Sequence, residues 1–121
     1  MKLIVAYIQP HALTRVEHAL LHLPDFPGLS VSEVRGFGQG KVRQVHTVRE
    51  ALTEFTGKVR LEIAALDEQT EAIVGAIATA AHSGRRGDGK ILVLDLAAAV
   101  RIRTGDRDGQ AIRSADLDEP A

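Results

Sequence analysis

Residues 83–90, with the sequence SGRRGDGK, have the composition of an anion-binding loop. Their three glycines free the backbone to present successive N–H groups to an anion, and the two arginines and Lys90 add positive charge. Gly84, Gly89 and Lys90 also have P-loop spacing, but Ile91 stands where the Mg-binding Ser or Thr is required, and a strand follows instead of a helix. The segment predicts a phosphate cradle and excludes a P-loop NTPase. The competing interpretation is a helix capped by Gly84 that runs into an ordinary glycine-rich turn.

A second candidate anion-binding segment is Arg101-Ile102-Arg103-Thr104-Gly105. In an extended chain, residues two apart point to the same side, so Arg101 and Arg103 could straddle phosphate oxygens. Surface arginines at alternate positions are common, and this segment by itself favours a solvated strand edge.

Three histidines lie at separations of seven and four residues, His11, His18 and His22. This spacing places them near one face of a helix, where His18 and His22 could bind a divalent metal. Arg15 lies in the same stripe and would repel a cation, so a solvated helix face is the better interpretation.

The residue types needed for catalysis are not arranged as in an enzyme. We find no Ser/His/Asp arrangement and no pair of acidic residues at a spacing that indicates acid–base chemistry. The chain has no cysteine, which excludes disulfides, thiolate zinc sites and a cysteine nucleophile. The sequence therefore predicts a non-enzymatic protein.

The elements that must position these segments follow from the hydrophobic pattern. Strands are predicted at residues 3–8, 29–34, 59–63 and 91–94, and helices at 12–23 and 67–81. The strand at 91–94 is expected to be the shortest. This order, βαββαβ, predicts an α+β fold of the ferredoxin-like type, an antiparallel sheet with two helices on one face. The other face would be exposed in a monomer, which favours self-association.

Length and charge limit the organisation of the chain. Its 121 residues, 45% of them hydrophobic, suffice for one domain, which we place at 1–112, with a disordered tail at 113–121. The net charge of −1 gives no reason to expect nucleic acid or an anionic membrane as a partner. The apolar opening segment stops at Gln9-Pro10, too short for a signal peptide or a membrane span, so a cytoplasmic protein is expected.

Four segments in register resemble the PII signal-transduction family. The resemblance extends over about residues 1 to 112, in the right order and spacing, and rests on residues 28–38, 58–63, 83–90 and 101–105. It implies a homotrimer with one nucleotide, ATP or ADP, in each of three clefts between subunits. Mg is a possible companion ion.

The resemblance also implies which residues bind the nucleotide. The adenosine part would be lined by Ser30, Gly38, Glu62 and Ala64. The phosphates would be held by Gly87, Asp88, Gly89 and Lys90, with Arg101 and Arg103 reaching in from the neighbouring subunit.

The segment 39–57 occupies the place of the family's T-loop, which docks on target enzymes, transporters or regulators. Its basic side chains, which could face an acidic partner, are Lys41, Arg43, His46 and Arg49. The only tyrosine is Tyr7, so uridylylation of a loop tyrosine is not available. Gln39 and Lys58 match the residues that bind Mg and 2-oxoglutarate in the family, although the loop is about one residue shorter than usual.

Two alternatives remain at this point. A ferredoxin-like RNA-binding module shares the order of elements but requires stacking aromatics that the central strand lacks. A metal-responsive trimer related to metal efflux would use the histidines of the first helix. The second ligand of a PII-like protein could be 2-oxoglutarate, bicarbonate or a metal.

Overall fold

The computed structural model describes residues 1–36 and 56–113. Its strands are β1 (Lys2–Ile8), β2 (Ser30–Gly36), β3 (Thr56–Ala65) and β4 (Gly89–Asp95). Its helices are the 3₁₀ turn η1 (Pro10–Ala12), α1 (Leu13–Leu21), α4 (Asp67–Ala81) and the short α5 (Gly109–Ile112). The order of the main elements is the predicted βαββαβ.

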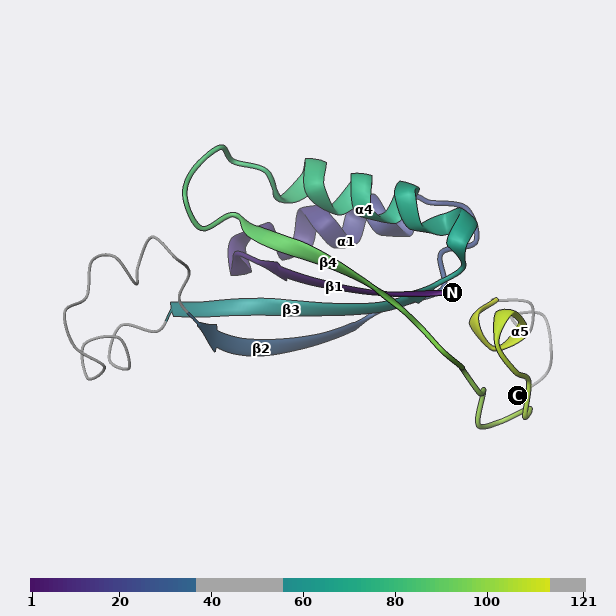
Figure 1. Cartoon of the computed structure of the whole chain (residues 1–121). Coiled ribbons are helices and arrows are strands. Elements are labelled where there is room, and N and C mark those ends of the chain that lie inside the picture. Colours follow the sequence, from purple (N-terminus) through teal and green to yellow (C-terminus); the bar gives the residue numbers. More distant parts are fainter. Residues whose placement is uncertain (37–55, 114–121) are drawn as a thin grey trace.

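The four strands form one antiparallel sheet in the order β2-β3-β1-β4. α1 and α4 lie side by side on one face of this sheet (Figure 1). The ferredoxin-like arrangement, with both helices on a single face, is therefore confirmed.

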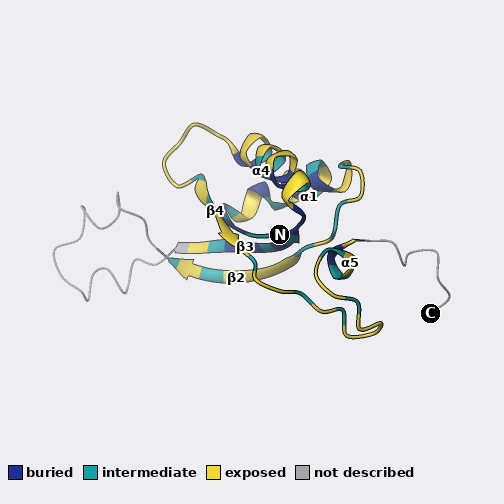
Figure 2. Cartoon of the chain, turned by 45° about the vertical axis from the view of Figure 1, so that its right-hand side comes forward, coloured by how far each residue is buried: buried dark blue, intermediate teal, exposed yellow. Residues whose placement is uncertain are grey.

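The hydrophobic core lies between the helices and the sheet. β1 supplies Ile4, Ala6 and Ile8, alternate residues that point to the same side of the strand. The other strands and the helices complete the core with Val59, Leu61, Ile63, Val16, Leu20, Ile73 and Ile77. Figure 2 shows this division: the dark blue surfaces of α1 and α4 face the sheet, and exposed residues cover their outer sides.

Strand β4 differs from the expectation. It has seven residues, as many as β1 and β2, so the prediction that it is the shortest strand is wrong. Its pairing with β1 runs from Gly89 opposite Ile8 to Asp95 opposite Lys2. Long-range pairing thus draws Gly89 and Lys90 out of the predicted loop and into the strand.

The segment after β4 also differs. Residues 96–113, which we call the C-terminal arm, run beyond the end of the sheet and finish in α5 (Figure 1). Arg101 and Arg103 do not lie in an extended chain as predicted, because the N–H of Gly105 donates to the carbonyl oxygen of Arg101 at 2.8 Å and closes a turn. The arm is anchored by Ile112, which is buried.

Candidate anion-binding site

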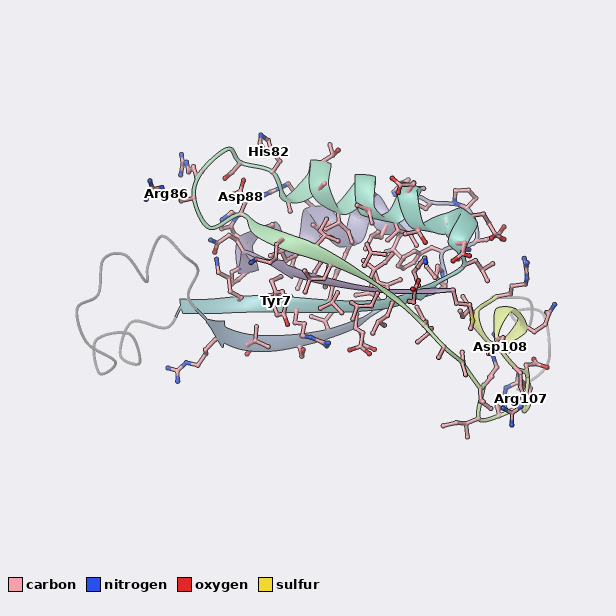
Figure 3. All side chains as sticks on the ribbon, viewed as in Figure 1. Tyr7, His82, Arg86, Asp88, Arg107 and Asp108 are labelled. Atoms are coloured by element: carbon pink, nitrogen blue, oxygen red, sulfur yellow. The ribbon has the colours of Figure 1, made fainter. Side chains whose placement is uncertain are left out.

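The loop between α4 and β4 is closed by its own aspartate. The carboxylate of Asp88 accepts hydrogen bonds from the backbone N–H of Ser83 at 2.7 Å and of Gly84 at 2.9 Å, and from the Ser83 hydroxyl. These bonds, first the one from the Ser83 hydroxyl, lower the pKa of Asp88 to about 2. The side chain of Asp88 therefore braces the loop, and Figure 3 shows it within the loop while Arg86 points outward.

Gly89, where the loop enters β4, allows the backbone to approach β1 closely. Gly89 has φ +111°, and a Cβ atom there would lie 1.7 Å from the carbonyl oxygen of Tyr7 on β1. Gly84 has φ +82° but lies beyond His82, the residue that caps the C-terminus of α4, so it does not cap the helix. The simple interpretation as a helix cap followed by an ordinary turn is not supported.

Two side chains, Gln9 and Lys58, hold the middle of the loop by hydrogen bonds to its backbone. The carbonyl oxygen of Gly87 accepts a hydrogen bond from Gln9 Nε2 at 2.6 Å and another from Lys58 Nζ at 2.8 Å. Burial lowers the pKa of Lys58, and the nearby charge of Asp88 opposes this shift. Lys58, predicted from the resemblance to meet a carboxylate, thus lies directly beside the loop.

A hollow of about 260 Å³ adjoins the loop, between the end of α4 and strands β1 and β4. Asp88, Gly89 and Lys90 lie along it. The remaining lining residues are Tyr7, Ile8, Ile77, Ala78, Ala81, His82 and Ile91.

The residues expected around the adenosine lie elsewhere on the sheet. Because Val59, Leu61 and Ile63 face the helices, the alternate residues Glu62 and Ala64 face the opposite side. Ser30 of β2 pairs with Glu62, on the same face. Strand order places β2 at the edge of the sheet opposite β4 and its loop.

Glu62 is part of a polar cluster on this open face. Its carboxylate accepts a hydrogen bond from Arg60 Nη1 at 2.6 Å. Hydrogen bonds with Glu62 and then with Tyr7 raise the pKa of Arg60. The cluster combines a carboxylate, a guanidinium and a phenol.

The two arginines of the C-terminal arm lie at the far end of β4 from the loop. Arg101 Nη2 donates to the carbonyl oxygens of Ala111, at 3.0 Å, and Arg113, and Nη1 is 3.6 Å from Asp106. The seven residues of β4 separate the arm from the loop by roughly 20 Å at about 3.3 Å per residue. One chain therefore does not bring Arg101 and Arg103 together with the glycine-rich loop (Figures 1 and 3).

Several predicted residues cannot be placed. Gly38 and Gln39, and the basic residues of the segment 39–57, Lys41, Arg43, His46 and Arg49, lie outside the described residues, as do positions 114–121 of the predicted tail. Residue 113 is described and follows α5.

His18 of α1 and His22, the residue that caps this helix, lie next to each other. The rings of His18 and His22 lie 4.3 Å apart, and Nδ1 of His22 is 2.7 Å from the carbonyl oxygen of His18. Among residues 1–36 and 56–113, no group of three His, Cys, Asp or Glu side chains could hold a metal ion.

The sequence pattern predicted no role for two side chains near the site, Gln9 and Arg60. Gln9 follows the first strand and contacts the loop 78 residues later. Arg60 alternates with Lys58 and Glu62 on β3, and this alternation was a usable signal for its position on the open face. No local pattern pointed to Gln9.

The fold and the loop together define a ferredoxin-like subunit with a glycine-rich loop at one end of its sheet and a pair of arginines at the other.

Comparison with known proteins identifies the family. Residues 1–106 match the family described as nitrogen regulatory protein P-II, and the chain belongs to this family. It is 42% identical to a nitrogen regulatory protein P-II of Azospirillum brasilense, over 93% of this chain and 100% of the relative. It is 40% identical to the P-II protein of Rhizobium etli and 37% identical to the nitrogen regulatory protein GlnK of Escherichia coli (strain K12), with the same coverage.

Membership gives the general character of the protein. PII proteins are signal-transduction regulators and not enzymes, and they are trimers that interact with target proteins. None of the helices within residues 1–36 and 56–113 has the length and apolar character needed to cross a membrane.

Proposed function

We propose that this chain is a cytoplasmic PII-type regulator that binds ATP or ADP in clefts between neighbouring subunits. In response to the bound nucleotide it controls a partner protein, an enzyme, a transporter or a transcriptional regulator. The observation that carries the proposal is the division of the candidate site between two ends of the sheet. The glycine-rich loop precedes β4, and the arm with Arg101 and Arg103 follows it. A ligand that touches both ends must lie between two copies.

One half of the proposed cleft is the glycine-rich loop. Gly87, Asp88 and Gly89 offer backbone N–H groups to phosphate oxygens, and Lys90 adds a positive charge. The Asp88 carboxylate is occupied by Ser83 and Gly84, so it preorganises these N–H groups instead of facing the anion. Preorganised donors bind an anion without the cost of ordering the loop.

The neighbouring chain supplies the other half. Its Arg101 and Arg103 would reach the phosphates, while Ser30, Glu62 and Ala64, on the open face of the sheet, would line the adenosine part. Gly38 would complete the adenosine part. Arg101 already donates to the carbonyls of Ala111 and Arg113, so binding phosphate redistributes the five N–H donors of its guanidinium.

A second, smaller ligand would bind at Lys58. This ammonium donates one hydrogen bond to the carbonyl oxygen of Gly87, and an ammonium has three N–H groups to donate. We propose 2-oxoglutarate as that ligand, and Gln39 would help to hold it together with Mg. The segment 39–57, with its basic residues, is the proposed surface for the partner protein.

Isothermal titration with ATP, ADP and AMP, each with and without Mg and 2-oxoglutarate, tests the proposal. We expect about one nucleotide per chain, and a loss of about 1.5 to 3 kcal/mol of binding free energy in Arg103→Ala, as for a lost charged hydrogen bond. Absence of binding to every nucleotide would contradict the proposed function.

Mixed trimers test the division of the cleft. Lys90→Ala and Arg103→Ala are each expected to bind weakly as pure proteins. After unfolding and refolding together they should regain tight sites, because a wild-type loop from one variant then faces wild-type arginines from the other. A mixture that binds no better than the separate variants would show that each chain builds its site alone.

A further inference from the structure

The Gly87 carbonyl oxygen is shared by two donors of different character, the neutral amide of Gln9 and the ammonium of Lys58. We propose that Gln9 is a positioning residue of the anion loop, which holds Gly87 in place when Lys58 turns toward an anionic ligand. This inference rests on the proposed function, and it assigns a role to a residue outside the predicted site.

Strand pairing puts Gln9 in this place. Gln9 directly follows Ile8, which pairs with Gly89, so the chain leaving β1 passes beneath the loop that enters β4. The approach is close: a Cβ atom on Gly87 would lie 2.8 Å from Gln9 Nε2 and 3.4 Å from Lys58 Nζ. Gly87 therefore leaves just enough room for both donors.

The two donors respond differently to an anion. The ammonium of Lys58 is attracted to a carboxylate or phosphate. Burial lowers the pKa of Lys58, and a nearby negative charge acts in the opposite direction, because it favours the protonated form. The amide of Gln9 carries no charge and does not follow the ligand. A carbonyl oxygen has two lone pairs, so Gln9 keeps the Gly87 oxygen satisfied when Lys58 departs.

Holding this carbonyl also sets the direction of a donor. In a trans peptide the C=O of Gly87 and the N–H of Asp88 lie in one plane and point in opposite directions. Gln9 therefore fixes the orientation of the Asp88 N–H, one of the donors proposed for phosphate. It also keeps the partial negative charge of the Gly87 oxygen turned away from the anion.

The first test needs no ligand. In ligand-free protein, we expect amide hydrogen exchange in the peptide 84–90 to be at least about threefold faster in Gln9→Ala than in the wild type. Gln9→Met keeps the length of the side chain but has no N–H donor, and it should exchange as fast as Gln9→Ala. The matched control is Gln69→Ala, since Gln69 Nε2 also donates to a backbone carbonyl, that of Asp25 at 3.0 Å, near the opposite end of α4. An unchanged exchange rate in Gln9→Ala would overturn the proposal.

The second test measures nucleotide binding. The Kd for ATP should rise about threefold to tenfold in Gln9→Ala and in Gln9→Met, as for one lost neutral hydrogen bond, and stay within twofold of the wild type in Gln69→Ala. If the wild type binds no nucleotide, the proposed function fails, while the exchange experiment still decides whether Gln9 holds the loop. If Gln9→Ala binds ATP as the wild type does, the positioning role is overturned.

Discussion

At the scale of single residues, Asp88 shows how an acidic side chain can serve an anion site without facing the anion. Its two carboxylate oxygens accept three hydrogen bonds from Ser83 and Gly84. The negative charge of the carboxylate therefore stabilises the loop itself. These bonds hold Gly84 and Ser83, four and five residues before Asp88, in the geometry that directs the loop toward β4. The loop is therefore shaped before any ligand arrives.

This arrangement predicts a dependence on pH. The pKa of Asp88 is about 2 in the folded protein against an ordinary value of 3.8, so its contribution to stability is complete above pH about 4 and is lost as the pH falls toward 2. Asp88→Asn cannot lose a charge. The difference in unfolding free energy between wild type and Asp88→Asn, measured by urea unfolding, should be constant above pH about 4 and shrink toward pH 2. A difference that is independent of pH throughout would contradict this role.

At the scale of elements, the sequence predicted the parts that depend on local patterns. The helix at 67–81 was predicted with the limits of α4, because Asp67 and Glu68 suit its N-terminus and the run of apolar and alanine residues continues to Ala81. The limits of β4 were missed, since they depend on pairing with β1, more than 80 residues away. The contact of Gln9 with Gly87 joins residues 78 apart in the sequence, and no local pattern predicts it.

Pairing of β4 with β1 provides the prediction at this scale. In Gly89→Ala, the new Cβ would collide with the Tyr7 carbonyl oxygen, and φ +111° would strain the backbone. We expect a loss of at least about 2 kcal/mol in the free energy of unfolding, measured with urea. The control is Gly57→Ala on β3, where a Cβ meets nothing within 4 Å among residues 1–36 and 56–113, and a change within about 0.5 kcal/mol is expected. Equal effects of the two substitutions would show that the close approach is unimportant.

At the scale of the whole molecule, the open face of the sheet explains why the protein needs copies of itself. Leu92 and Leu94 of β4 are 43% and 47% exposed, and they lie on the face away from the helices, since Ile91 packs against the core. The C-terminal arm adds Ile102, which is 99% exposed. A trimer, the state of PII proteins, provides partners for such surfaces.

A single charge on the open face should therefore separate the subunits. We expect Leu92→Glu to lower the mass measured by light scattering to about a third, because burying a carboxylate without a partner is costly. Circular dichroism should remain that of the folded chain. Leu21→Glu is the matched control, since Leu21 is 71% exposed on α1, in the helix layer, and this variant should remain trimeric. A trimeric Leu92→Glu protein would place the subunit contact elsewhere.

The separation of the loop from the arginine-bearing arm by the length of β4 has a genetic consequence. Under the proposed division, every chain helps to build two of the three clefts, one with its loop and one with its arm. Consider a cell that expresses a normal allele and an allele altered in both the loop and the arm. A single altered chain would then impair two clefts of any mixed trimer. Such an allele would be dominant. An allele altered only in the loop and another altered only in the arm would complement each other.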